Sequence, residues 1–277
     1  MNLAALLPLR DSLAAHGLLA RKSFGQHFLL DLNITRKIAR LAGPLEDRAV
    51  IEVGPGPGGL TRALLEAGAR VIAVEKDERF RPLLQELAAA SGGALTPLFA
   101  DALEADEAAL AAEHAPGLPL RIVSNLPYNV GTPLLIKWLT GKAAWEAMAL
   151  MFQQEVARRV VASPGEPDYG RLSVIGQALS RPSIVMDLPA RAFTPPPRVD
   201  SAVVRFNPPS ARLAPKLVSR LEQVTQAAFG QRRKMLRSSL KRLGGESLLE
   251  RVGLDPQLRA EDVPVQDFQR LAEATAS

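Results

Sequence analysis

Short runs of consecutive apolar residues alternate with segments of helical periodicity from Arg48 to about Phe206. Runs that are apolar on successive residues indicate strands buried on both faces, as the strands of parallel sheets are. The expected strands are residues 49–53, 71–74, 120–123 and 147–152, and the expected helices are residues 60–67, 79–89 and 133–139. Residues 95–99 are a weaker strand candidate because Pro97 interrupts the run. This alternation predicts a doubly wound α/β sheet with helices on both faces.

The pattern changes after the predicted sheet. Residues 184–188 and 201–206 lie on either side of Pro195-Pro196-Pro197 and predict an antiparallel pair of strands at the sheet edge, followed by a linker over 207–210. Four helical segments separated by glycines and prolines then predict a smaller all-helical domain, at residues 215–229, 234–243, 247–252 and 265–272. We therefore divide the chain into an N-terminal helical segment (1–47), an α/β domain (48–208) and a helical domain (209–277).

The composition is typical of a soluble globular protein, because 47% of the 277 residues are hydrophobic and 23% are charged. The absence of cysteine excludes disulfides and thiolate chemistry. The three histidines, His16, His27 and His114, are far apart in the sequence, so no metal site is expected. Residues 1–9 are apolar without a basic leader and predict an amphipathic helix, and no apolar run approaches the ~20 residues of a membrane span. These features predict a cytoplasmic protein without membrane contact.

Positive charge is concentrated near the C-terminus. The net charge is +5, but the segment from Arg205 to Gly245 contains a single acidic residue, Glu222, against ten basic ones: Arg205, Arg212, Lys216, Arg220, Arg232, Arg233, Lys234, Arg237, Lys241 and Arg242. Subtracting these from 34 basic and 29 acidic residues leaves 24 and 28 in the rest of the chain. A mildly acidic body joined to a strongly basic segment favours a polyanion binder. A solvated helix face would give the same run of charge.

The stretch Asn125-Leu126-Pro127-Tyr128 directly follows a predicted strand. An exocyclic amino group of a nucleobase is a poor nucleophile because its lone pair is delocalised into the ring. The Asn125 side-chain oxygen and the Leu126 carbonyl, which Pro127 holds outward, can accept both N–H groups and free that lone pair. The ring of Tyr128 can then stack on a base taken out of its helix. Taken alone, these four residues also suit an ordinary loop after a buried strand.

A glycine-rich turn, Gly54-Pro55-Gly56-Pro57-Gly58-Gly59, follows the first predicted strand. Glycines there let the backbone approach a ligand closely. Glu75, at the end of the second strand, is placed to bind ribose hydroxyls. The turn and Glu75 together predict an adenosine-containing cofactor, and NAD and S-adenosylmethionine both fit.

Asp101 follows the third strand, where its carboxylate can accept a hydrogen bond from the adenine amino group of such a cofactor. An equally good interpretation is that Asp101 caps a helix over 102–110. With Gly54, Glu75 and Asn125 it completes a series of four consecutive strand ends that carry a possible ligand group. Ligands of open α/β sheets bind at these carboxyl ends, so we expect the four to lie together.

Five stretches of the chain resemble, in the same order, the 16S ribosomal RNA adenine dimethyltransferases. They are Ser23-Phe24-Gly25-Gln26-His27-Phe28-Leu29, Glu52-Val53-Gly54-Pro55-Gly56-Pro57-Gly58, Asn125-Leu126-Pro127-Tyr128, Phe193-Thr194-Pro195-Pro196-Pro197-Arg198-Val199-Asp200-Ser201 and Phe229-Gly230-Gln231-Arg232-Arg233-Lys234-Met235-Leu236. More distant similarity extends to the erythromycin-resistance 23S RNA methyltransferases and to mitochondrial transcription factor B. One departure is His27, where the family usually has asparagine.

The resemblance implies a Rossmann-like class I methyltransferase fold and S-adenosylmethionine as cofactor. It implies that the N-terminal segment contributes to the cofactor site, with His27 and Leu29 over the cofactor. Gly54 and Gly56 would then contact its methionine part, Glu75 its ribose, Asp101 its adenine, and Asn125 both the cofactor and the target amino group. It further suggests that Phe193 stacks on the target adenine opposite Tyr128, although the residues alone favour Phe193 as an anchor of the proline turn.

The sequence therefore predicts an enzyme that dimethylates N6 of two adjacent adenosines near the 3′ end of 16S ribosomal RNA, in the small subunit or its precursor. RNA phosphates are expected to bind Arg232, Arg233, Lys234, Arg237 and Lys241. We expect a monomer. The 23S-specific enzymes are the nearest alternative. A nicotinamide-dependent dehydrogenase would leave Asn125–Tyr128 unexplained, and a non-catalytic RNA-binding assembly factor would leave the cofactor ligands unexplained.

Overall fold

The computed structural model describes residues 2–18 and 26–275. The chain divides into two compact units, each discontinuous in sequence. The first comprises Met1–Leu135, Lys142–Gln154 and Ile184–Phe206, and the second comprises Ile136–Gly141, Glu155–Ser183 and Asn207–Ser277. The assignment of a cofactor-site contribution to residues 1–47, of methyl transfer to 48–208 and of RNA binding to 209–277 stays a prediction.

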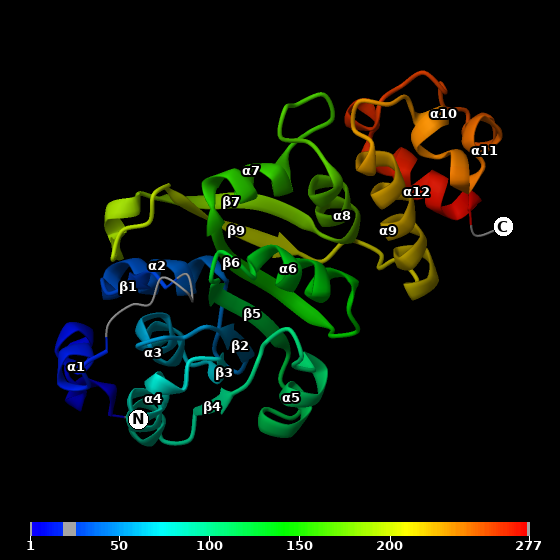
Figure 1. Cartoon of the computed structure of the whole chain (residues 1–277). Helices are drawn as coiled ribbons and strands as arrows, with labels where there is room; N and C mark the ends of the chain where they lie inside the picture. Colours follow the sequence, from blue (N-terminus) through cyan, green and yellow to red (C-terminus); the bar gives the residue numbers. More distant parts are fainter. Residues whose placement is uncertain (1, 19–25, 276–277) are drawn as a thin grey trace. The chain divides into compact units, whose positions relative to one another are not determined.

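The main sheet has seven strands in the order β4-β3-β2-β5-β6-β9-β7 (Figure 1). The strands are β2 (Ala49–Val53), β3 (Arg70–Glu75), β4 (Leu95–Phe99), β5 (Leu120–Asn125), β6 (Trp145–Gln153), β7 (Arg181–Leu188) and β9 (Ser201–Asn207). Strands β2 to β6 pair in parallel, and β9 runs antiparallel to β6. The predicted doubly wound α/β class is confirmed.

The strands of the sheet follow directly from the apolar runs. All five residues of β2 are buried, as expected for a parallel strand covered on both faces. Pro97 is accommodated because β4 is an edge strand, where a missing backbone N–H costs no ladder hydrogen bond. The register pairs Val53 with Val74 and Glu75 with Phe99, so the residues after β2, β3 and β4 emerge at one edge of the sheet.

The first unit also contains α1 (Leu9–Ala15), α2 (Leu32–Leu41), α3 (Gly59–Glu66), α4 (Arg81–Ala90) and α5 (Glu107–His114), and α6 (Gly131–Thr140) begins in it. The predicted helix over residues 1–9 is wrong. Leu3–Ala5 form a single 3₁₀ turn, and α1 begins only after Pro8, which precedes the first helical residue. Proline has no N–H and fits before a helix better than within it.

A second, two-stranded sheet joins segments that are far apart in sequence. β1 (Phe28–Leu29) pairs antiparallel with β8 (Phe193–Thr194), so that Leu29 lies opposite Phe193. The two strands are too short to give a periodic pattern, and the apolar periodicity of the chain does not predict them. This sheet fixes the N-terminal segment beside the turn that contains Pro195.

The second unit is helical over α7 (Gln154–Val161), α8 (Arg171–Leu179), α9 (Pro215–Gly230), α10 (Leu236–Ser239), α11 (Gly245–Arg251) and α12 (Val265–Ala274). In its core, the buried rings of Tyr169 and Phe268 both contact the half-buried Phe229, Tyr169 in an edge-to-face arrangement, and the Tyr169 hydroxyl donates to the Val263 carbonyl at 2.8 Å. The predicted helix over 234–243 is wrong at its start. Met235 forms an isolated β-bridge with Arg259 and the Leu236 N–H donates to the Leu258 carbonyl, so long-range backbone contacts hold Lys234 and Met235 outside the helix.

Candidate functional site

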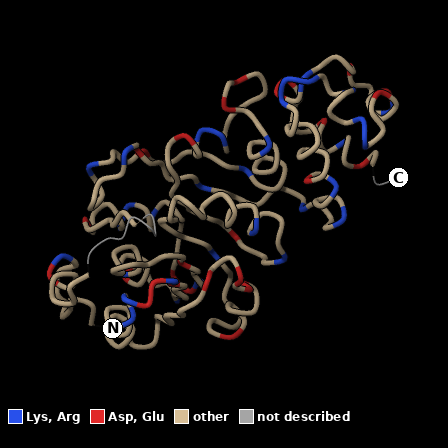
Figure 2. The backbone as a smooth tube through the Cα atoms, viewed as in Figure 1, with Lys and Arg blue, Asp and Glu red and all other residues tan. Residues whose placement is uncertain are grey.

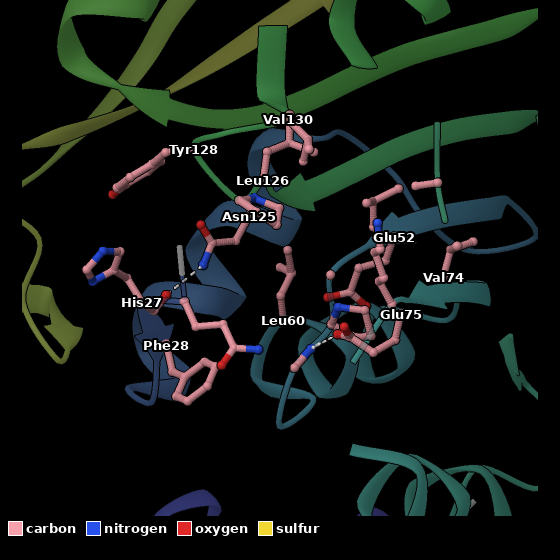
Figure 3. Close-up of a pocket in the computed structure, with 18 of the residues that line it drawn as sticks. His27, Phe28, Glu52, Leu60, Val74, Glu75, Asn125, Leu126, Tyr128 and Val130 are labelled. Carbon is pink, nitrogen blue, oxygen red and sulfur yellow. Dashed lines mark hydrogen bonds between the residues drawn. The ribbon is translucent and has the colours of Figure 1, made fainter. Parts of the chain in front are cut away.

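A cavity of about 280 Å³ opens at the carboxyl ends of β2 to β5 (Figure 3). It is lined by the glycine-rich turn, by Glu52 and Glu75, by Asp101 and by the loop that follows Asn125. The four groups expected to meet at the strand ends, Gly54, Glu75, Asp101 and Asn125, all lie on its wall. Because the parallel strands end in register, groups that follow one another at 21 to 26 residues along the sequence share one site.

The glycine-rich turn is bound to Glu75. Gly56 has a φ of 52°, in the left-handed region that favours glycine, and its N–H donates to Glu75 Oε2 at 3.0 Å. The Asp77 N–H donates to Glu75 Oε1 at 2.8 Å. At Gly59, a Cβ would lie 2.5 Å from the Leu29 carbonyl oxygen, so only glycine allows α3 to approach β1 this closely. Burial raises the pKa of Glu75, and the two backbone donors oppose that rise.

Glu52 is a second buried carboxyl group, and our sequence reasoning assigned it no role. It is 1% exposed, the second-last residue of β2, and its Oε2 atom has no hydrogen-bond partner. Burial raises its pKa to about 8, and the neighbouring Glu75 acts in the same direction. A charged residue in the middle of the otherwise apolar run Val50-Ile51-Glu52-Val53 is the signal that could have identified it.

This burial predicts that folding stability falls as pH rises. Folded Glu52 keeps its proton up to about pH 8, whereas the unfolded side chain loses it near its ordinary value of 4.5, so the folded state binds more protons in between. We expect the wild-type free energy of unfolding to fall, relative to Glu52→Gln, by roughly 3–4 kcal/mol between pH 5 and pH 8. Urea titrations of both proteins across this range measure the difference. Parallel pH profiles would show that Glu52 is ionised in the fold.

Asp101 does not cap the helix that follows it. Its Oδ1 atom accepts from the Leu103 N–H at 2.9 Å in a turn, and its Oδ2 atom pairs with Lys76 Nζ at 2.7 Å. Helix α5 begins later, at Glu107, and Asp106 is its cap. The helix expected over 102–110 is therefore wrong in its bounds, while the carboxylate of Asp101 stays on the cavity wall.

The loop Asn125–Tyr128 closes one end of the cavity. The Asn125 Nδ2 group donates to the His27 carbonyl at 3.3 Å, which leaves the side-chain oxygen on the side of Tyr128 (Figure 3). A Cβ at Gly54 would lie 3.3 Å from Pro127 Cδ, so the proline packs directly on the glycine-rich turn. The Tyr128 hydroxyl and Ser201 Oγ are 2.7 Å apart, and burial raises the pKa of this tyrosine. Leu126 is 2% exposed.

The remaining predicted site residues of the first unit fall into two groups. His27 and Leu29 lie on the cavity wall, Leu29 being 4% exposed. Phe193 is 3% exposed and packs in the apolar core with Leu29 and Met151, and it is not among the described residues that line the cavity. Stacking of Phe193 on a target base stays a prediction. Of the motif 23–29, residues 23–25 lie outside the described part of the chain.

The basic residues predicted to bind RNA differ in their surroundings. Arg232 donates to Glu261 Oε2 at 3.0 Å and to the carbonyls of Pro167 and Tyr169, so its guanidinium is engaged within the second unit. All five residues are exposed, and the other four lie between the end of α9 and the turn after α10, a part of the chain where Figure 2 shows several blue segments: Arg233, Lys234, Arg237 and Lys241. Arg232 therefore has a structural role within the second unit, whereas the other four are exposed cations.

Membrane-spanning helices and metal sites were the two remaining features to look for in the structure. Over the part of the chain that the structure describes, none of the helices is both long and apolar enough to cross a bilayer. Within the same part, no group of three or more His, Asp and Glu side chains is arranged to hold a metal ion.

Known proteins resemble this chain over nearly its full length. The chain is 66% identical to ribosomal RNA small subunit methyltransferase A of Phenylobacterium zucineum, covering 99% of this chain and 94% of that protein. It is 61% identical to the enzyme of the same name from Caulobacter vibrioides, over 93% and 98% of the two chains.

Among solved structures, a dimethyladenosine transferase from Plasmodium falciparum is similar with a TM-score of 0.74 at 22% identity, over 88% of this chain and 96% of that one. The 23S rRNA methyltransferase ErmE is similar with a TM-score of 0.67 at 27% identity, over 90% and 100%. Residues 17–277 match the family described as ribosomal RNA adenine dimethylase. The chain belongs to the ribosomal RNA adenine dimethylase family.

Proposed function

We propose that this protein transfers methyl groups from S-adenosylmethionine to N6 of two adjacent adenosines near the 3′ end of 16S ribosomal RNA, two methyl groups to each. The observation that carries the proposal is the loop Asn125–Tyr128, which places an amide oxygen and an aromatic ring at the end of an acidic cavity. Relatives at 61–66% identity are named for the small subunit, whereas the 23S enzyme ErmE is 27% identical, and this supports the 16S substrate over the 23S alternative.

The cavity fits S-adenosylmethionine, which carries a sulfonium and an ammonium group. The wall carries the carboxyl groups of Glu52, Glu75 and the partly buried Asp101, whose oxygen atoms can accept hydrogen bonds from the ammonium group of such a ligand. The turn at Gly54 and Gly56 leaves room for close approach, since both residues have positive φ and no side chain. Glu75 would accept from the ribose hydroxyls and Asp101 from the adenine amino group, with His27 and Leu29 at the other wall. When bound, the cofactor supplies an electrophilic methyl group for direct displacement.

The residues of the loop prepare the nucleophile. The Asn125 Oδ1 atom and the Leu126 carbonyl would accept the two N–H groups of the target amine, which localises its lone pair toward the cavity. Tyr128 would stack on the flipped base, because its hydroxyl is already held by Ser201 and its ring is fixed. The catalytic contribution is then positioning and hydrogen bonding, with no covalent bond to a protein side chain.

The exposed cations of the second unit, Arg233, Lys234, Arg237 and Lys241, would bind the phosphates of the RNA. Phosphate contacts fix the orientation of a nucleic acid, whereas the base site selects the nucleotide that reacts. This proposal assigns the two tasks to different parts of the chain.

The direct test is mass spectrometry of 16S and 23S RNA from a strain that lacks this protein. We expect two unmethylated adenosines near the 3′ end of 16S RNA and unchanged 23S RNA. Purified protein with S-adenosylmethionine should then restore four methyl groups per small subunit. Fully methylated 16S RNA in the deletion strain would contradict the proposal, and loss of a 23S modification would favour the alternative.

Glu75→Ala should weaken S-adenosylmethionine binding by roughly 1.5–3 kcal/mol, the range for a hydrogen bond to a charged group. Calorimetry measures the dissociation constant. Glu75→Gln keeps one acceptor for the Gly56 N–H and should lose less, while Glu78→Ala, an exposed glutamate on the next turn, should bind normally. Unchanged affinity in Glu75→Ala would leave Glu75 with a role in the turn alone.

A further inference from the structure

The imidazole of His27 lies against the tyrosine of the base site. The His27 and Tyr128 rings are stacked, with centroids 5.5 Å apart and planes inclined by 28°. The His27 Nδ1 atom is 2.9 Å from the Pro195 carbonyl oxygen. Figure 3 shows the ring beside Tyr128, on the far side of Asn125 from Glu52 and Glu75. The ring therefore belongs to the end of the cavity where the base would enter.

The backbone of the same residue orients Asn125. The His27 carbonyl accepts from Asn125 Nδ2 at 3.3 Å. A rotation of the amide by 180° would place two oxygen atoms against each other, and this repulsion disfavours the flipped orientation. The contact thus holds the Asn125 oxygen in the position of an acceptor for the target amine.

These contacts connect His27, Tyr128, Ser201 and Pro195 in a closed circuit beside the base site. Tyr128 is held at its hydroxyl by Ser201 and at its face by His27. His27 is held in turn by the carbonyl of Pro195, and the segment from Pro195 to Ser201 joins the two anchors covalently. A stacking platform fixed at both ends loses less conformational entropy when a base binds.

We propose that His27 is a positioning residue of the base site: its ring supports Tyr128, and its backbone carbonyl orients Asn125. This inference rests on the proposed function. It differs from the role implied by the resemblance, in which the side chain at this position binds the cofactor. The asparagine usual in the family carries its side-chain N–H group on Cγ, as histidine carries Nδ1. Asparagine has no ring, however, so the support of Tyr128 is specific to the histidine.

Substitutions of His27 separate the two side-chain contacts. His27→Phe keeps a ring and loses the hydrogen bond to Pro195, whereas His27→Asn keeps a donor and loses the ring. His27→Ala loses both, and His114→Ala on α5 is a histidine control outside the site. For each protein we would measure the dissociation constant of S-adenosylmethionine by calorimetry and kcat and KM on unmethylated small subunits. Quenching of 2-aminopurine placed at the target position of a substrate RNA reports stacking without turnover.

We expect all variants to bind S-adenosylmethionine within about twofold of wild type. His27→Phe, which keeps the ring but loses the anchor to Pro195, should stay closer to the wild-type KM and quenching than the other two variants. His27→Asn and His27→Ala should raise KM about 3–10-fold and reduce quenching, the range for one aromatic pair. In a Tyr128→Ala background the His27→Ala change should add almost nothing, because the ring acts through Tyr128.

Two results would overturn the inference. A cofactor affinity about tenfold weaker in His27→Ala and His27→Asn, with RNA parameters unchanged, would make His27 a cofactor ligand. Wild-type behaviour of every variant would make its ring a passive surface group. Thermal unfolding separates either result from misfolding, and His27→Phe and His27→Asn remain informative if His27→Ala does not fold. Wild-type protein that binds S-adenosylmethionine but methylates no small subunit would instead refute the proposed function itself.

Discussion

Replacement of Asn125 by alanine should reduce methyl transfer by about two orders of magnitude or more while S-adenosylmethionine binds within a few-fold of wild type. The Asn125 oxygen is oriented by the His27 carbonyl and faces the base end of the cavity. Its hydrogen bond to the amine strengthens as the lone pair localises, so the loss falls on the transition state and not on the ground state. Removal of one such preorganised group commonly costs a factor of 10²–10³ in kcat.

A matched substitution tests whether the acceptor is the essential feature. Asn125→Asp keeps an oxygen toward the amine but replaces the donor to His27 with a second acceptor, so we expect it to be more active than Asn125→Ala and less active than wild type. Single-turnover rates on unmethylated small subunits, with cofactor affinity measured by calorimetry, provide both quantities. If Asn125→Ala retains most of its single-turnover rate, the amine is activated by another group.

Neutralising Arg233, Lys234 and Arg237 with glutamine should weaken RNA binding and make it less sensitive to salt. All three side chains are exposed near α10. Each phosphate contact releases counterions, so losing three should lower the slope of log affinity against log salt by about 2–3. Arg232 is left in place because its bonds to Glu261 and to the Pro167 and Tyr169 carbonyls hold the second unit together.

The control for this charge change is a triple substitution of equal charge elsewhere. Lys37, Arg40 and Arg70 are exposed cations of the first unit, and their replacement by glutamine alters the net charge by the same amount. We expect the control to retain most of the wild-type salt slope, and we expect both triple variants to bind S-adenosylmethionine normally. Equal slopes in the two variants would mean that net charge alone, and not the surface around α10, determines RNA affinity.

The sequence alone predicted the sheet and the gathering of its strand ends, because both depend on local patterns. Consecutive apolar residues identify buried parallel strands, and β2 was predicted with its observed bounds. Parallel strands put their carboxyl ends at one edge, so the order of the strands already predicts that Gly54, Glu75, Asp101 and Asn125 line one cavity, as they do. Helix starts were less predictable, because α1, α5 and α10 all begin later than expected. Pro8 sets the start of α1, the cap Asp106 sets the start of α5, and the bridge between Met235 and Arg259 sets the start of α10.

Only the tertiary structure decided what surrounds each side chain. Glu52 acquires its raised pKa from burial between elements that no local pattern measures. Phe193 is taken into the core by the pairing of β8 with β1, and the exposed Arg232 is paired with Glu261, 29 residues away. His27 meets Tyr128 and Pro195 across 101 and 168 residues of chain respectively. Such contacts depend on where distant segments meet in space. The residue types that can perform the chemistry, in contrast, can be read from the sequence alone.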